Sequence, residues 1–340
     1  MKRLRSTRTV FAILGVALLS AVAAALLPDD PYQRSQLLDD TIHRKARWVY
    51  ERTHFDPAPI DVLVVGPSRI GAAVNAPQLG QALAARGLPA HVVNFSFPEA
   101  GRDINYAILE EVLETKRPKL VIVGVIEQPG RYGHSAFKYM ARPGLIADPV
   151  YAANFNYPAN LMYLPFRQMK LFLARLAPGA MGLSKSFDPK AYPGSTYNTT
   201  GDITLPDGTV REGDTPAAAA ELDRGVRKLE ASIDPQYLPE SMADIEFGDE
   251  RFNIRRMAAL ADRHGAKLAF LALPYYTGPT TIQERAFYGH YGPVWNAGFL
   301  SPHAEWFMDY GHLTSGGAQV LTDWLAPRAA AELERQGKSR

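Results

Sequence analysis

Short apolar runs alternate with longer amphipathic stretches along much of this chain. The apolar runs have the length and the Val and Ile content of buried strands, and the stretches between them carry apolar residues every three or four positions, as helices do. Strands are expected at 60–65, 90–94 and 120–125, and helices at 76–86 and 103–115. This alternation predicts an α/β fold in which helices cover both faces of a parallel sheet.

The alternation stops after the third predicted strand. Residues 129–245 are rich in Pro, Gly and Tyr. In them we expect helices at 165–176 and 217–231 and a hairpin at 201–213. The pattern then resumes with a helix, a strand and a closing helix, at 249–264, 267–273 and 316–335. We therefore predict that 129–245 is a long insertion at the catalytic face of the sheet. It is either a lid or acceptor-binding wall, or a segment that only packs over the sheet.

The N-terminus carries a cluster of basic residues followed by a long uncharged run. At about 1.5 Å per residue the run at 9–27 spans roughly 28 Å, close to the hydrocarbon thickness of a bilayer. Residues 1–30 are therefore either a signal anchor with its basic end in the cytoplasm or a signal peptide cleaved near 21–23. We expect an inner-membrane anchored protein with its catalytic domain in the periplasm or another extracytoplasmic space, or, as the alternative, a secreted protein.

Residues 31–59 are mostly polar, with one helix-like stretch at 41–52. We predict that they form a stalk between the membrane segment and a catalytic domain that occupies 60–340.

Composition excludes several classes of function. The chain has 340 residues, no cysteine and a formal net charge of +2, and the cations at the N-terminus exceed this excess. The remainder is slightly acidic, so a nucleic-acid partner is not expected. Thiolate chemistry and disulfides are excluded. His290 and His303 lack the spacing of metal ligands, and we expect neither a metal nor a cofactor.

Two short segments far apart in the sequence carry the residues of a hydrolytic centre. Ser68 follows the first predicted strand after the turn Gly66-Pro67, which would expose its hydroxyl at the carboxyl edge of the sheet. Asp309 and His312 are spaced so that the carboxylate reaches the imidazole nitrogen that faces away from the serine. A serine hydroxyl needs such a base to become nucleophilic. In the alternative interpretation Ser68 only caps a helix and His312 is a surface histidine.

These segments resemble conserved blocks of the SGNH/GDSL-type serine hydrolases and acyltransferases. The first block is 66–69, the second is 94–101, and the last is 309–313 followed by 314–318. The resemblance implies a flavodoxin-like three-layer α/β/α sandwich, with Ser68, His312 and Asp309 as the catalytic triad. It also implies an oxyanion hole from the backbone amides of Ser68 and Gly101. The third block departs from the family pattern, because Gln128 stands near the position of the usual asparagine, and its amide is a candidate donor to the oxyanion.

Four other residues are candidate substrate contacts. Arg69, next to the nucleophile, could contact an anionic substrate or form a salt bridge, and Arg102 follows the oxyanion glycine. Tyr275 and Trp295 belong to an aromatic group that precedes Asp309, and they would form either a stacking platform for sugar rings or part of the core.

An exported protein of this type resembles the SGNH proteins that add or remove acetyl groups on extracellular polysaccharides. The resemblance therefore implies an esterase or O-acyltransferase that acts on acyl esters of a polysaccharide or cell-wall polymer, alongside polysaccharide export or modification machinery. The alternatives are a lipase or thioesterase, and a non-catalytic, membrane-anchored scaffold or glycan-binding subunit.

Overall fold

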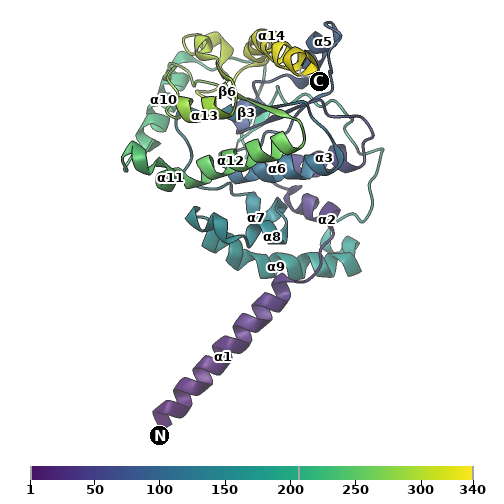
Figure 1. The fold of residues 1–340 in the computed structure, drawn as a ribbon, viewed down its shortest axis with the longest axis vertical. Helices are drawn as coiled ribbons and strands as arrows, with labels where there is room; N and C mark the ends of the chain where they lie inside the picture. Colours follow the sequence, from purple (N-terminus) through teal and green to yellow (C-terminus); the bar gives the residue numbers. More distant parts are fainter. Residues whose placement is uncertain (1, 206, 339–340) are drawn as a thin grey trace.

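A parallel sheet of five strands forms the centre of the structure, a computed structural model that describes residues 2–205 and 207–338 (Figure 1). The strands are β1 (Val62–Val65), β2 (Val92–Asn94), β3 (Leu120–Val125), β6 (Lys267–Ala272) and β7 (Val294–Asn296). Their order is β2-β1-β3-β6-β7, and every neighbouring pair is parallel. The chain thus reverses direction across the sheet at β1, and in such sheets a crevice forms at the carboxyl ends of the strands beside the reversal. The predicted α/β fold is confirmed, although the three-residue strand β7 was not predicted.

Helices cover both faces of this sheet (Figure 1). One face packs against α5 (Ala76–Ala84) and α14 (Ser315–Lys338), and the other against α3 (Lys45–His54), α6 (Arg102–Thr115) and α12 (Gly248–Arg263). Along β1, Val62 and Val64 point to the first face, and Leu63 and Val65 to the second. All four side chains are buried, as expected for a parallel strand between two helical layers.

A single long helix, α1 (Lys2–Ala25), projects away from the domain (Figure 1). Among the described residues, Thr7–Ala25 is the stretch of helix long and apolar enough to cross a membrane, and none of its residues is fully buried inside the protein. This is compatible with the predicted signal anchor and equally with a signal sequence.

The stalk predicted for 31–59 is wrong, because this segment is part of the domain. It folds into α2 (Pro31–Ser35), a 3₁₀ turn (Gln36–Leu38) and α3. Trp48 and Val49 of α3 belong to the apolar cluster on one face of the sheet. The indole nitrogen of Trp48 donates to the carbonyl of Gly194 at 3.0 Å. The prediction failed because this mostly polar segment carries a few apolar residues on one face of α3, and these pack against the sheet.

The long segment between β3 and β6 divides into parts with different locations. The helices α7 (Phe137–Met140), α8 (Pro143–Ile146) and α9 (Tyr157–Leu176) lie beyond the α3 and α6 layer, beside α2 and near the end of α1 (Figure 1). The predicted hairpin is present as β4 (Ile203–Thr204) and β5 (Val210–Arg211), and α10 (Ala219–Ser232) and α11 (Ala243–Glu246) follow it. The insertion therefore does not lie at the catalytic face as a whole. The short helices α4 (Ser68–Gly71) and α13 (Arg285–Tyr291) complete the core.

Candidate active site

Ser68 lies where the first strand of the sheet ends. β1 ends at Val65, the turn Gly66-Pro67 follows, and α4 begins at Ser68. Gly66 is needed here, because a Cβ at this position would lie 3.1 Å from the Cα of Gly124 on the neighbouring strand β3. Because Ser68 follows the end of β1 directly after this turn, it lies half-buried at the carboxyl edge of the sheet, as predicted.

His312 and Asp309 lie in a tight loop between β7 and α14. A bridge between Phe307 and Leu313 closes this loop, and the N–H of Met308 donates to the carbonyl of His312 at 3.0 Å. The backbone N–H groups of Gly311 and His312 both donate to Oδ1 of Asp309 at 2.8 Å. The carboxylate is therefore held by the backbone of its own loop before it contacts the imidazole.

The structure brings the three predicted residues into one hydrogen-bonded series. Nε2 of His312 lies 2.8 Å from Oγ of Ser68, although the two residues are 244 positions apart in the sequence. Nδ1 of His312 lies 2.8 Å from Oδ2 and 3.0 Å from Oδ1 of Asp309. A carboxylate at this distance favours the tautomer in which Nδ1 carries the proton, which leaves Nε2 free to accept the proton of Ser68.

The surroundings of Asp309 keep its carboxyl group ionised, as its contact with Nδ1 of His312 requires. Burial alone would raise the pKa of Asp309, but the hydrogen bond from His312 and those from two backbone N–H groups outweigh it, so the pKa lies below its ordinary value. Asp309 therefore remains a carboxylate near neutral pH and stabilises a positive charge on His312.

Ser68 and His312 line a cleft of about 850 Å³. Its walls come from three segments that are distant in sequence: 39–45, 96–99 and 199–205 with Gly208. The first precedes α3, the second follows β2, and the third contains β4. Sequence analysis missed the first wall because it was assigned to the stalk, and no motif in the third marks it as part of a site.

Charged side chains line this cleft, and two of them titrate in an unusual range. Burial raises the pKa of Asp39 to about 6, and it lowers the pKa of Lys45 to about 7. Nζ of Lys45 donates to the carbonyl of Asn94 at 3.2 Å. The hydroxyl of Ser96 is buried in the cleft wall with no hydrogen-bond partner within the described part of the chain. These groups are candidate contacts for a polar substrate.

Two of the candidate oxyanion donors, Gly101 and Gln128, line a second and much smaller hollow, which the residue before Ser68 also lines. Pro67, Gly101 and Gln128 line a space of about 20 Å³, room for about one water molecule. Gly101 begins α6 with φ 155°, and a Cβ there would lie 2.3 Å from the backbone nitrogen of His134. One amide proton of Gln128 is donated to the carbonyl of Asp234 at 2.7 Å, so this side chain is tied to the segment after α10.

The four predicted substrate contacts do not line the cleft that contains Ser68 and His312. Arg102 is buried, and its guanidinium donates to Glu250, to Asn105 and to the carbonyl of Gly124, so the prediction that it binds substrate is wrong. Arg69 pairs with Glu127 at 2.8 Å and donates to the carbonyl of Leu273 at 2.6 Å.

The two aromatic candidates are core residues. Tyr275 is buried, and its hydroxyl donates to Glu230 at 3.2 Å. Trp295 lies on β7 in the apolar cluster with α5 and α14. Of the two alternatives left open by the sequence, the structure supports the core for both residues, and the salt bridge for Arg69.

A pair of buried acids supports the loop that carries Gly101. Asp103 accepts the N–H of His134 at 2.7 Å, and Asp249 accepts the N–H of Arg102 at 3.1 Å. The amide of Asn154 lies 3.4 Å from Asp103 and 3.3 Å from Asp249. Burial and the mutual repulsion of the two acids raise the pKa of Asp103, and burial raises the pKa of Asp249 to about 7.

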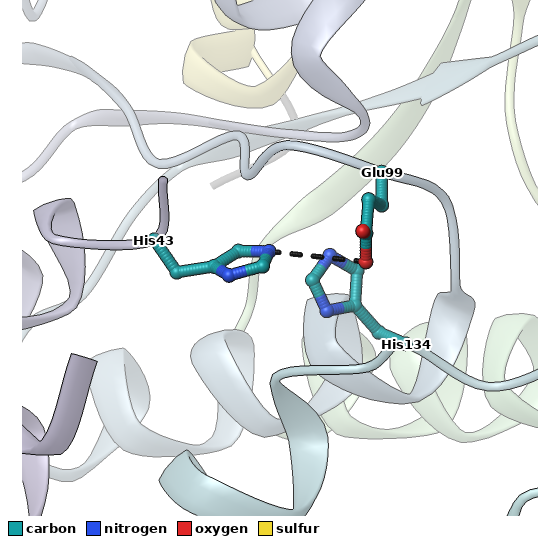
Figure 2. Close-up of side chains that lie close together, drawn as sticks. All are labelled: His43, Glu99 and His134. Atoms are coloured by element: carbon teal, nitrogen blue, oxygen red, sulfur yellow. Dashed lines mark ion pairs between the residues drawn. The ribbon is translucent and has the colours of Figure 1, made fainter. Parts of the chain in front are cut away.

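Three residues of metal-ligating types converge at His43, Glu99 and His134, of which Glu99 lines the cleft and the two histidines are buried (Figure 2). Nε2 of His43 lies 3.9 Å from Oε2 of Glu99. Nδ1 of His134 accepts the N–H of Ala136 at 3.0 Å, so the proton of its neutral ring is on Nε2, which lies 2.5 Å from the carbonyl oxygen of Pro98. A histidine that ligates a metal through Nε2 normally donates its Nδ1 proton, and this arrangement does the reverse. The geometry of His134 therefore disfavours a metal.

No protein-family model and no curated protein matches the chain in sequence.

Proposed function

We propose that this chain is a serine-dependent esterase or O-acyltransferase of the SGNH type, held at a membrane by α1. The observation that carries the proposal is the series Ser68, His312 and Asp309, with 2.8 Å between Oγ and Nε2 and 2.8 Å between Nδ1 and the carboxylate. These distances lie within the hydrogen-bonding reach that proton transfer between nucleophile and base requires. The strand order of the sheet, with Ser68 after β1, also supports the family fold.

The reaction would proceed in two acyl-transfer steps. Oγ of Ser68 attacks the carbonyl carbon of an ester while Nε2 of His312 takes its proton, and the carbonyl oxygen becomes an oxyanion. The oxyanion collapses, the bond to the alcohol breaks, and His312 returns the proton to the departing alkoxide. His312 then deprotonates water or an acceptor hydroxyl, whose oxygen attacks the carbonyl carbon of the acyl-serine. The second oxyanion collapses, the bond to Oγ breaks, and His312 returns the proton to Ser68. Asp309 holds the tautomer throughout.

Donors beside Ser68 would stabilise the oxyanion. The candidates are the backbone N–H groups of Ser68 and Gly101, with the second amide proton of Gln128. The small hollow that Gly101 and Gln128 share with Pro67, the residue before Ser68 in the sequence, supports this assignment, because it has room for about one oxygen atom.

The walls of the cleft support a polar acceptor over a long acyl chain. Both acidic and basic side chains line it, at Asp39, Asp40, Arg44, Lys45 and Asp202. Hydroxyl groups of a sugar can donate to these carboxylates and accept from the cations, whereas a fatty acyl chain would leave them without partners. We therefore favour an acyl ester, acetyl in the first instance, of an extracellular polysaccharide or cell-wall polymer, handled beside polysaccharide export or modification machinery.

Labelling with a fluorophosphonate tests the proposal. The full chain in detergent should become covalently labelled, and Ser68→Ala should abolish the label. Ser232→Ala is the matched control, because Ser232 is exposed at the end of α10, and it should be labelled like the parent protein. Absence of label on the folded parent protein would overturn the proposal and favour a non-catalytic scaffold. Release of acetate from an acetylated polysaccharide, or transfer of acetyl to an added oligosaccharide, would then separate esterase from transferase.

A further inference from the structure

Helix α9 exposes a continuous apolar stripe on the surface of the domain. The exposed side chains recur at three- and four-residue intervals, and they are Met162, Phe166, Met169, Leu173 and Leu176, with Leu161 beside them. Met162 is 74% exposed and Phe166 is 65% exposed, values that are unusual for large apolar side chains. Such a stripe marks a surface that has a partner.

The opposite face of α9 is fixed firmly to the domain, so the stripe cannot turn inward. Arg167 is buried, and it donates to the carbonyls of Lys138 and Ala141, both at 2.8 Å. Leu164 and Leu171 are also buried. The stripe therefore faces outward as a consequence of how α9 packs.

The end of α1 packs against this same helix. Ala21, Ala24 and Ala25 of α1 are half-buried, and α1 contacts α9 (Figure 1). The amide of Gln168 donates to the carbonyl of Leu27 at 2.8 Å. The amide of Gln33, just after α1, lies 3.3 Å from the carbonyl of Ala174. The point at which the apolar span ends is thus joined to α9.

Length and charge then place α9 at a membrane surface. The span Thr7–Ala25 has the length of the hydrocarbon core, so its C-terminal end would emerge at the interface. α9 runs across that end (Figure 1). The sequence 157–176 contains no Asp or Glu, and Lys170 and Arg175 are exposed. Exposed apolar side chains with flanking cations are typical of helices that lie in the plane of an anionic lipid surface.

We propose that α9 is an interfacial helix that docks the domain on the same bilayer that α1 crosses. Its apolar stripe lies among the headgroups and upper acyl chains, and Lys170 and Arg175 contact lipid phosphates. This proposal rests on α1 remaining attached as an anchor, but not on the acyl-transfer chemistry. Docking at two points, α1 and α9, would fix the orientation of the domain and direct the layer of α5 and α14 away from the bilayer (Figure 1).

The absence of cysteine permits a direct test with single-cysteine variants of the full chain. Met162→Cys, Phe166→Cys and Leu173→Cys report on the stripe, Leu14→Cys reports on α1, and Ala85→Cys after α5 is the control on the far side of the domain. Each variant is labelled with the fluorophore NBD. It is then reconstituted into vesicles of phosphatidylcholine and phosphatidylglycerol that carry a nitroxide either high on the acyl chain or near its end.

We expect the three stripe labels to emit at shorter wavelength than the Ala85→Cys label and to lose most of their fluorescence to the shallow nitroxide. The Leu14→Cys label should be quenched by the deep one. Stripe labels that behave like Ala85→Cys, while Leu14→Cys is quenched, would overturn the docking proposal alone. Failure of Leu14→Cys quenching would overturn the anchor as well. Stripe labels protected by contact with a second copy, seen as cross-linking between cysteines without lipid quenching, would also overturn it.

Discussion

Replacement of Asp309 by asparagine tests the triad through its least exposed member. In the structure Oδ1 of Asp309 accepts two backbone N–H groups and lies 3.0 Å from Nδ1 of His312, whereas Oδ2 lies 2.8 Å from Nδ1. An asparagine at this position can keep its oxygen on the two backbone N–H groups, and its amide nitrogen then replaces Oδ2. A donor would face Nδ1, so the imidazole would keep its proton on Nε2 and could not accept the proton of Ser68.

The expected loss is large although the change in shape is small. Wrong-tautomer substitutions of this kind in serine hydrolases lower kcat by about 10⁴-fold, which corresponds to about 5.5 kcal/mol of transition-state stabilisation. The loss should appear in kcat for p-nitrophenyl acetate. The thermal unfolding midpoint should stay close to that of the parent protein, because the backbone hydrogen bonds of the loop are retained.

A second carboxylate provides the matched control. Asp323 lies on the exposed side of α14, where it accepts from Gln78 at 2.8 Å, and Asp323→Asn should leave kcat unchanged. If Asp309→Asn stays within about tenfold of the parent protein while Ser68→Ala is inactive, Asp309 does not set the tautomer, and our account of the site is incorrect.

Three further predictions concern the frame around the site. Burial raises the pKa of Asp249 to about 7, so the folded protein binds a proton that the unfolded chain has already lost. The unfolding midpoint should therefore fall as pH rises from about 4 to about 7 and this contribution should level off above 7, and Asp249→Asn should flatten this dependence; an equal slope in the variant would contradict the assignment. Glu250→Ala leaves the guanidinium of Arg102 buried without its carboxylate, and we expect about 3 to 5 kcal/mol lower stability in chemical denaturation, whereas an unchanged midpoint would show that the pair is dispensable. At Gly124 a Cβ would lie 2.1 Å from Cγ1 of Ile70, two residues after Ser68. Gly124→Ala should therefore lower both the stability of the protein and its labelling by fluorophosphonate. Values like those of the parent protein in both measurements would show that this contact does not hold Ser68 in place.

The local features of this protein were predictable from its sequence. The alternation of apolar runs and amphipathic stretches predicted the parallel sheet, because side-chain burial repeats with the period of the secondary structure. The three-residue spacing of Asp309 and His312 and the position of Ser68 after a strand predicted the three members of the proposed triad, because both depend on a few neighbouring residues. Closure of the triad over 244 positions confirmed their proximity.

Only the tertiary structure decided which partners each charged side chain has and which segments line the cleft. Arg69 and Arg102 resemble substrate contacts in the sequence, but their partners are Glu127 and Glu250, so both guanidinium groups are structural. Residues 39–45 resemble part of a linker, yet they form a wall of the cleft. The sequence determines which side chains a segment carries and with what period, whereas the role of a charge is set by the burial and the partners that distant segments provide.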